Sequence, residues 1–182
     1  MRLTEQEEAC FWRCAGPLLR DAKVREMQNY CQHGEVTCLN HSLCVARRSF
    51  YWCRRLHCKA DVRSLVTGAL LHDFFLYDWH KKGGRKGLHG FTHPRTALQN
   101  ASRRFPLTPT ERDIILRHMW SLTLTPPHTR EGMLVCLADK YCAVKETLFC
   151  RRHAVAERRN GFWKRRRSSR DVTGILKAGN TR

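Results

Sequence analysis

The chain has 182 residues, of which 42% are hydrophobic and 27% are charged, a composition typical of one soluble globular domain. No stretch approaches the roughly 20 apolar residues of a membrane-spanning helix, and the acidic N-terminus has no apolar signal core, so we expect a cytoplasmic protein. The net charge of +18 indicates a polyanionic partner or an anionic substrate.

The ten cysteines have two possible uses besides packing. A disulfide scaffold is disfavoured because the chain is long and has no signal segment. Structural zinc is disfavoured because no Cys-x-x-Cys occurs; the nearest pairs are Cys10/Cys14 and Cys53/Cys58. Several cysteines lie in apolar stretches, so we expect reduced thiols that pack as small hydrophobic side chains.

The N-terminal third predicts helices. Thr4 to Glu7 fits a capping box, and the helix that it begins is expected to run to about Tyr30. Gly16-Pro17 can interrupt this helix. Residues 31–34 indicate a break. From 36 to about 58 apolar residues recur every three or four positions, which predicts a helix with His41 near the edge of its apolar stripe.

Asp61 can cap a helix from Val62 to about Asp73, which is apolar on several sides and therefore expected at the centre of the fold. A basic glycine-rich loop follows, between 77 and 91, and it does not match the phosphate-loop pattern. Thr92-His93-Pro94 is expected to begin a helix that ends near Arg104, with the proline in its first turn.

Thr108 to Glu111 is a second capping box, whose helix carries His118. Thr125-Pro126-Pro127 ends that segment, and a last helix begins near Thr129 and carries Asp139. No strand alternation of useful length appears, so the predicted fold class is all-α, with about six helices. The predicted divisions are an N-terminal helical segment (1–35), a helical metal-binding domain (36–150) and a basic, partly disordered extension (151–182).

The stretch from Ala69 to Phe75 contains the first candidate functional residues of the chain. His72 and Asp73 stand between apolar residues, and buried polar groups are costly unless they are hydrogen-bonded, paired or bound to metal. Facing helices in a bundle can supply metal ligands to its core. We therefore expect both residues to bind metal together with His41, His93, His118 and Asp139.

The order of these six residues resembles the HD-domain superfamily of metal-dependent phosphohydrolases. The resemblance covers roughly residues 36–149, and the six positions together are specific, whereas a His-Asp pair alone is not. The local sequences that carry it are Asn40-His41-Ser42, Leu70-Leu71-His72-Asp73, His93-Pro94, Ile115-Leu116-Arg117-His118 and Leu137-Ala138-Asp139-Lys140.

The resemblance implies that one metal ion is held at the positions matched by His41, His72, Asp73 and Asp139. His93 and His118 make the chain similar to the subgroup that holds two ions, with Asp73 bridging them. Imidazole and carboxylate ligands suit Fe, Mn, Zn, Co or Ni rather than Mg or Ca. Two such ions would activate a water to hydroxide, which attacks phosphorus.

The sequence departs from the family where several subgroups have Lys or Glu four residues after the histidine, because Leu76 stands there. The expected catalytic residues are Asp73, Asp78 and Lys140, although Asp78 is as readily a turn residue. Side chains for the substrate phosphate would come from a wider basic set, although charge runs are usually solvated. That set comprises His80, Lys81, Lys82, Arg85, Lys86 and Arg117.

The predicted function is therefore a metal-dependent phosphohydrolase for phosphate mono- or diesters, with nucleotides or cyclic nucleotides as the expected substrates. One alternative is an HD-fold protein that binds or cleaves nucleic acid through its basic tail, although that tail has only Phe162 and Trp163 for base stacking. The other is a non-catalytic helical domain that uses metal for stability. Among the remaining histidines, His89 is notable because it precedes His93 by four residues.

Overall fold

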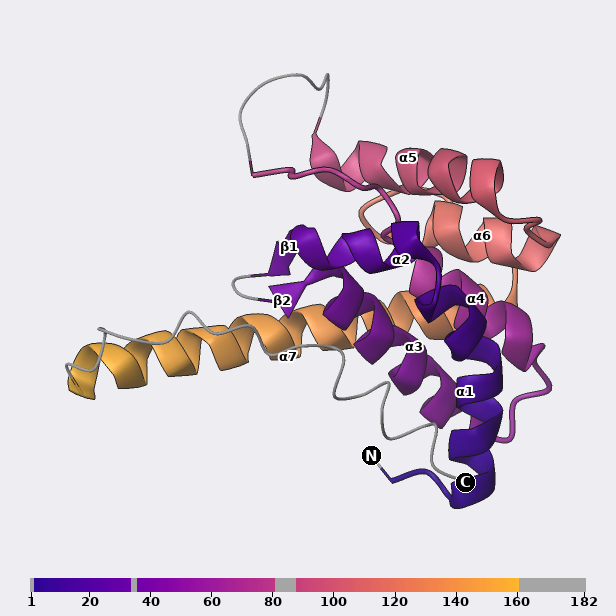
Figure 1. Cartoon of the computed structure of the whole chain (residues 1–182), viewed down its shortest axis with the longest axis horizontal. Coiled ribbons are helices and arrows are strands. Elements are labelled where there is room, and N and C mark those ends of the chain that lie inside the picture. The colour runs from indigo at the N-terminus through magenta and orange to yellow at the C-terminus, as the bar shows by residue number, and fades with distance from the viewer. Residues whose placement is uncertain (1, 34–35, 81–87, 161–182) are drawn as a thin grey trace.

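The computed structural model describes residues 2–33, 36–80 and 88–160, which contain seven α-helices (Figure 1). The all-α prediction is confirmed, since strands are confined to a two-stranded hairpin in this part of the chain. The elements in order are α1 (Glu5–Leu19), α2 (Ala22–Glu26), η1 (Met27–Asn29), β1 (Cys31–His33), β2 (Val36–Thr37), α3 (Cys38–Arg55), α4 (Val62–Leu71), α5 (His89–Arg104), α6 (Pro109–Arg117) and α7 (Arg130–Asn160).

The N-terminal capping box forms as predicted: the Glu7 backbone N–H donates to Thr4 Oγ1, and the Thr4 N–H donates to the Glu7 carboxylate. The expected single helix to Tyr30 is wrong, because α1 ends at Leu19. Asp21 then caps the separate helix α2 by accepting from two of its backbone N–H groups. Pro17 does not break α1, since it lies in the last turn of that helix.

Residues 31–33, where the sequence predicted a break between helices, form the strand β1, which pairs antiparallel with β2 before α3. Cys31 pairs with Thr37 in this sheet, and Trp79 donates its indole N–H to the Cys31 carbonyl. Thr37 then caps α3 by accepting from the Asn40 N–H, so α3 begins two residues later than the pattern predicted. The hairpin also carries Gln32, whose side chain is buried and reaches the functional site described below.

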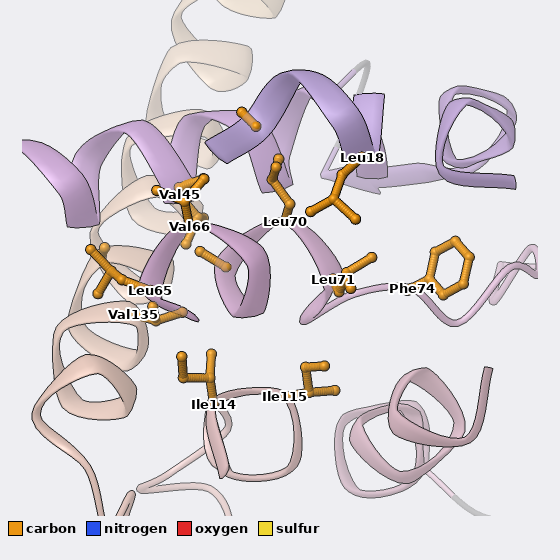
Figure 2. Packing of buried hydrophobic residues seen from close by; sticks show 14 of the residues in the cluster. Leu18, Val45, Leu65, Val66, Leu70, Leu71, Phe74, Ile114, Ile115 and Val135 are labelled. Carbon is orange, nitrogen blue, oxygen red and sulfur yellow. The ribbon is translucent and has the colours of Figure 1, made fainter. Parts of the chain in front are cut away.

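The predicted central helix is confirmed as α4, which Asp61 caps and which packs against α1, α3, α5, α6 and α7. Its side chains Leu65, Val66, Leu70 and Leu71 are fully buried. Figure 2 shows them among labelled apolar side chains of the neighbouring helices. Burial of each such side chain contributes about 1.5–3 kcal/mol, so α4 organises the core.

The ends of α4, α5 and α6 differ from prediction in ways that matter for the site. α4 ends at Leu71, so His72 is its C-cap residue and Asp73 lies in the following turn. α5 begins at His89, one turn earlier than expected, and Pro94 therefore lies inside that helix rather than in its first turn. The second capping box forms at Thr108 and Glu111, and α6 ends with His118 as its C-cap residue.

α7 is the longest helix and crosses the whole domain, with its C-terminal half extending past the other helices in Figure 1. It passes through position 150, where the sequence suggested a boundary; the proposed divisions at 35 and 150 stay predictions. Of the predicted basic extension (151–182), residues 161–182 lie outside the described residues. Within the helices that are described, none has an apolar stretch of the length needed to cross a membrane.

Candidate metal centre

Six polar side chains from five elements meet at the centre of the helical domain. His41 comes from the first turn of α3, His72 and Asp73 from the end of α4, and His93 from α5. The end of α6 and the middle of α7 complete the set with His118 and Asp139. Each of the six is at most 9% exposed, although every one is polar or charged. The predicted convergence of these residues is therefore confirmed.

The cluster is tight. His41 Nε2 lies 2.9 Å from Asp139 Oδ1, and His72 Nε2 lies 3.3 Å from Asp73 Oδ2 and 3.7 Å from Asp139 Oδ1. On the other side, Asp73 Oδ1 lies 3.2 Å from His93 Nε2 and 3.7 Å from His118 Nε2. Asp73 therefore stands between two groups of imidazoles and faces each with a different oxygen.

Three of the histidines have their orientation and proton fixed by their own helices. The Nδ1 atoms of His72, His93 and His118 lie 2.7, 2.9 and 2.8 Å from the carbonyl oxygens of Ala69, His89 and Ile115. A carbonyl can only accept, so each Nδ1 is protonated, and Nε2 is the ring nitrogen that faces the cluster and can bind a metal ion. Metal-binding histidines in proteins are held in the same way.

His93 and His118 show why a cation fits here. Their Nε2 atoms are 2.8 Å apart. Since both Nδ1 atoms carry the ring protons, two neutral rings would point lone pairs at each other across this distance. Such a contact is repulsive unless a proton or a metal ion stands between the nitrogens. Burial, with the nearby imidazoles of His72 and His93, lowers the pKa of His118 to about 3, which disfavours a proton on that ring.

His41 is held by a second carboxylate outside the predicted set. Its Nδ1 lies 2.8 Å from Glu146 Oε2 and its Nε2 lies 2.9 Å from Asp139 Oδ1, and since a carboxylate only accepts, both ring nitrogens donate when no metal ion is bound. Burial lowers the pKa of His41, but Asp139 and Glu146 outweigh burial and raise that pKa to about 9. Without a metal ion a proton is thus drawn to His41, because the carboxylates beside it need a positive charge.

Asp73 is the most constrained carboxylate of the centre. Gln32 donates its side-chain N–H to Asp73 Oδ2 at 2.6 Å, while Asp73 Oδ1 and His72 Nε2 are buried with no hydrogen-bond partner. Burial raises the pKa of Asp73, but the imidazoles of His72 and His93 hold it well below its usual value. An ionised carboxylate with an unsatisfied buried oxygen is costly unless a cation binds it.

The donor atoms group into two overlapping sets that could each hold a metal ion. One set is His41, His72 and Asp139, and the other is His72, Asp73 and His118, with the ligand atoms of each set all within 4.8 Å of one another. His93 adds an imidazole beside the second set. Nitrogen-rich ligands of this kind suit transition metals.

The other predicted site residues lie outside this cluster or have local partners. Asp78 Oδ1 accepts from the His80 backbone N–H at 3.0 Å, the turn that the sequence alternative anticipated, and His80 is exposed. Arg117 pairs with Asp113 in α6. Lys140 donates to the His118 carbonyl at 3.2 Å. The basic side chains Lys81, Lys82, Arg85 and Lys86 lie outside the described residues.

Leu76, which replaces the family's Lys or Glu, is a half-buried residue with φ of 56°, a left-handed conformation that is uncommon for leucine. His89 contributes to the centre through its backbone and its ring. Its carbonyl accepts from His93, its ring stacks on the His93 ring at 4.6 Å, and its Nδ1 lies 2.9 Å from the Tyr77 hydroxyl. His89 therefore orients a residue of the cluster.

Glu146 and Gln32 were missed by sequence reasoning. Glu146 had a usable signal, because it follows Asp139 by seven residues and so lies on the same face of a helix. Gln32 had none, since it lies in a stretch that resembled a break and its partner Asp73 is 41 residues away.

The fold and the site together define a helical protein with a buried His/Asp cluster that could bind metal. This arrangement is compatible with an HD-like fold. No protein-family model, no curated protein and no solved structure matches the chain. The description of the chain as a helical protein with a possible metal site therefore depends on the geometry alone.

Proposed function

We propose that the protein is an HD-type metal-dependent phosphohydrolase that holds two divalent transition-metal ions and cleaves phosphate mono- or diesters, with nucleotides or cyclic nucleotides as substrates. The observation that carries this proposal is the pair of imidazole Nε2 atoms of His93 and His118, 2.8 Å apart with both ring protons used elsewhere. A merely structural hydrogen-bond network would offer a donor at that contact.

The assignment of ligands to two ions follows from the position of Asp73. His41, His72, Asp73 and Asp139 would hold one ion, while His93 and His118 would hold the second with Asp73 Oδ1. The Gln32 amide keeps Asp73 Oδ2 in place, and Glu146 keeps His41 in the tautomer that ligation requires. Metal ions so held lower the pKa of bound water and offset the charge that develops on phosphoryl oxygens.

Two properties of the chain support an anionic phosphate ester as substrate. The net charge of +18 raises the local concentration of anions. The chain that leaves the cluster after Asp73 also leads into the sequence Lys81-Lys82-Gly83-Gly84-Arg85-Lys86, which is rich in phosphate-binding side chains. The proposed roles of Asp78, Lys140 and Arg117 in catalysis or phosphate binding remain predictions.

The test uses full-length protein whose metals have been identified by elemental analysis. A panel of nucleotides, cyclic nucleotides and nitrophenyl mono- and diesters is assayed with wild type, Asp73→Asn and Asp61→Asn. Asp61 caps the other end of the same helix, and asparagine caps as well as aspartate does, so this control should remain active.

We expect Asp73→Asn to lose turnover by at least about 100-fold, the scale that loss of metal-centre chemistry implies. Its metal content should fall while its helical circular dichroism is retained. Full activity in Asp73→Asn would refute the assigned site. Stoichiometric metal without turnover of any ester would refute the enzyme and favour a metal-stabilised domain, and salt-dependent binding to RNA or DNA in that case would favour the nucleic-acid alternative.

A further inference from the structure

Two cysteines lie beside the metal centre and are used by nothing described so far. Cys44 follows His41 by three residues on α3, and Cys142 follows Asp139 by three residues on α7. Each thiol therefore lies one helical turn beyond a residue of the cluster. The two Sγ atoms are 3.4 Å apart, although 98 residues separate them in the chain.

This contact differs from the surroundings of the other described thiols. Cys136 donates to the Trp120 carbonyl, Cys53 to the Cys58 carbonyl and Cys38 to Gln32, so each of these sulfurs faces a non-sulfur partner. Among the thiols that the structure describes, no second pair is in hydrogen-bonding contact. A disulfide needs an S–S distance of about 2.05 Å, so a contraction of roughly 1.3 Å would join Cys44 to Cys142.

We propose that Cys44 and Cys142 form a redox-active dithiol site, which a hydroperoxide oxidises to a disulfide that braces α3 against α7. The site takes hydrogen peroxide or an organic hydroperoxide as its oxidant. It lies outside the metal centre and does not depend on the phosphohydrolase activity.

The accessible member of the pair determines the order of the chemistry. Cys44 is half-buried, whereas Cys142 is 1% exposed, so Cys44 meets the oxidant first. The hydrogen bond from Cys142 also lowers the pKa of the Cys44 thiol, which favours the nucleophilic thiolate.

The reaction balances in two steps. The Cys44 thiolate attacks the terminal peroxide oxygen, an S–O bond forms, the O–O bond breaks and an alcohol or water leaves after protonation. The Cys142 sulfur then attacks the Cys44 sulfur, the S–S bond forms, the S–O bond breaks and water leaves with the Cys142 proton. Two thiols are oxidised by two electrons, and one peroxide is reduced.

The bridge would act on the helices that supply the cluster. α3 carries His41 and α7 carries Asp139. Glu146, two turns after Asp139 on α7, already holds His41 across the same interface. A disulfide here would close a loop that contains most of the domain, which restricts the unfolded chain and raises stability.

The experiment treats the full chain with hydrogen peroxide, blocks remaining thiols in denaturant and maps disulfides by mass spectrometry without reduction. The variants are Cys44→Ser, Cys142→Ser and, as the matched control, Cys31→Ser, because Cys31 is an exposed thiol with no part in the site. We expect a peptide joining Cys44 to Cys142 in wild type and Cys31→Ser. Neither of the other two variants should yield it.

The same samples test the bracing. The urea midpoint of oxidised wild type should exceed that of reduced protein and return after treatment with dithiothreitol, and Cys142→Ser should show no such rise. The proposal is overturned if Cys44 and Cys142 are both still alkylated in wild type after Cys31 has been consumed. It is overturned equally if the bridge forms but lowers the midpoint.

Discussion

Gly68 lies where α4 crosses α6, four residues before His72, and its substitution by alanine tests how closely these two helices approach each other. A Cβ at Gly68 would lie 2.6 Å from Cδ1 and 2.9 Å from both Cβ and Cγ2 of Ile114. The Cδ1 atom can rotate away. Cβ is bonded to the α6 backbone and can move only if the helix itself moves, and Cγ2 can move only by a change of χ1 in this packed contact.

Two effects of opposite sign then compete in Gly68→Ala. Alanine gains about 1 kcal/mol over glycine in an exposed helix, whereas overpacking a buried contact costs about 1–3 kcal/mol. Three contacts below 3.0 Å favour the upper part of that range, so we expect a net loss of about 1–2 kcal/mol. For a domain of this size that loss lowers Tm by about 2–8 °C.

The assay is thermal and urea unfolding followed by circular dichroism, in a metal chelator so that ligand binding does not alter Tm. Gly16→Ala is the matched control, because its Cβ would meet only Arg20 Nη1 at 3.6 Å, on the outside of α1. Ile114→Val removes the nearest atom and should recover part of the loss in the double variant. If Gly68→Ala unfolds at or above the wild-type temperature, the close crossing of α4 and α6 is wrong.

Two further substitutions test hydrogen bonds inferred above. Glu146→Gln should weaken metal binding by about 10- to 100-fold, since Glu146 orients His41. Competition with a chromophoric chelator measures the metal affinity, and Glu5→Gln is the control because Glu5 is exposed. Equal affinities of the two variants would show that Glu146 is not part of the site. Asp113→Asn should cost about 2 kcal/mol, because this carboxylate accepts from Arg117 and from both N–H and hydroxyl of Thr129. Burial raises the pKa of Asp113, but these hydrogen bonds lower it below its usual value. Their contribution to stability is therefore present above about pH 4 and lost on acidification. Unfolding midpoints from pH 3 to 7 should vary less in Asp113→Asn than in wild type, and parallel profiles would contradict the role of the Asp113 carboxylate.

The first residues of helices could be predicted from the sequence where a local capping signal determines them. Both capping boxes formed, because Thr4 with Glu7 and Thr108 with Glu111 satisfy the free backbone groups within a single turn. The stop at Leu19 depends instead on Asp21. That carboxylate caps α2 and also pairs with Arg104 at 2.8 Å, a partner 83 residues away that no local pattern reveals.

The start of α5 was missed for a similar reason. Thr92 and Pro94 form a plausible N-terminus in isolation. In the folded protein the helix begins at His89, because the His89 ring packs on Phe75 and meets the Tyr77 hydroxyl. Tertiary contacts from the end of α4 thus add one turn, and that turn supplies the carbonyl that fixes the His93 ring.

His72 and Asp73 could be predicted because they place metal-competent side chains in an apolar context, which is costly without a purpose. The other four cluster residues were predicted from the order of histidines and aspartates over successive helices, which resembles the HD-domain superfamily. In α7, adjacency in sequence to a cluster residue did not identify a second residue of the site. Lys140 follows Asp139 directly, yet successive helical residues point about 100° apart, and its ammonium reaches the His118 carbonyl instead of the carboxylates. Glu146, two turns after Asp139, returns to the same face and binds His41. Helical periodicity, applied to α7 from Asp139, would have selected Glu146 as the partner and placed Lys140 off that face.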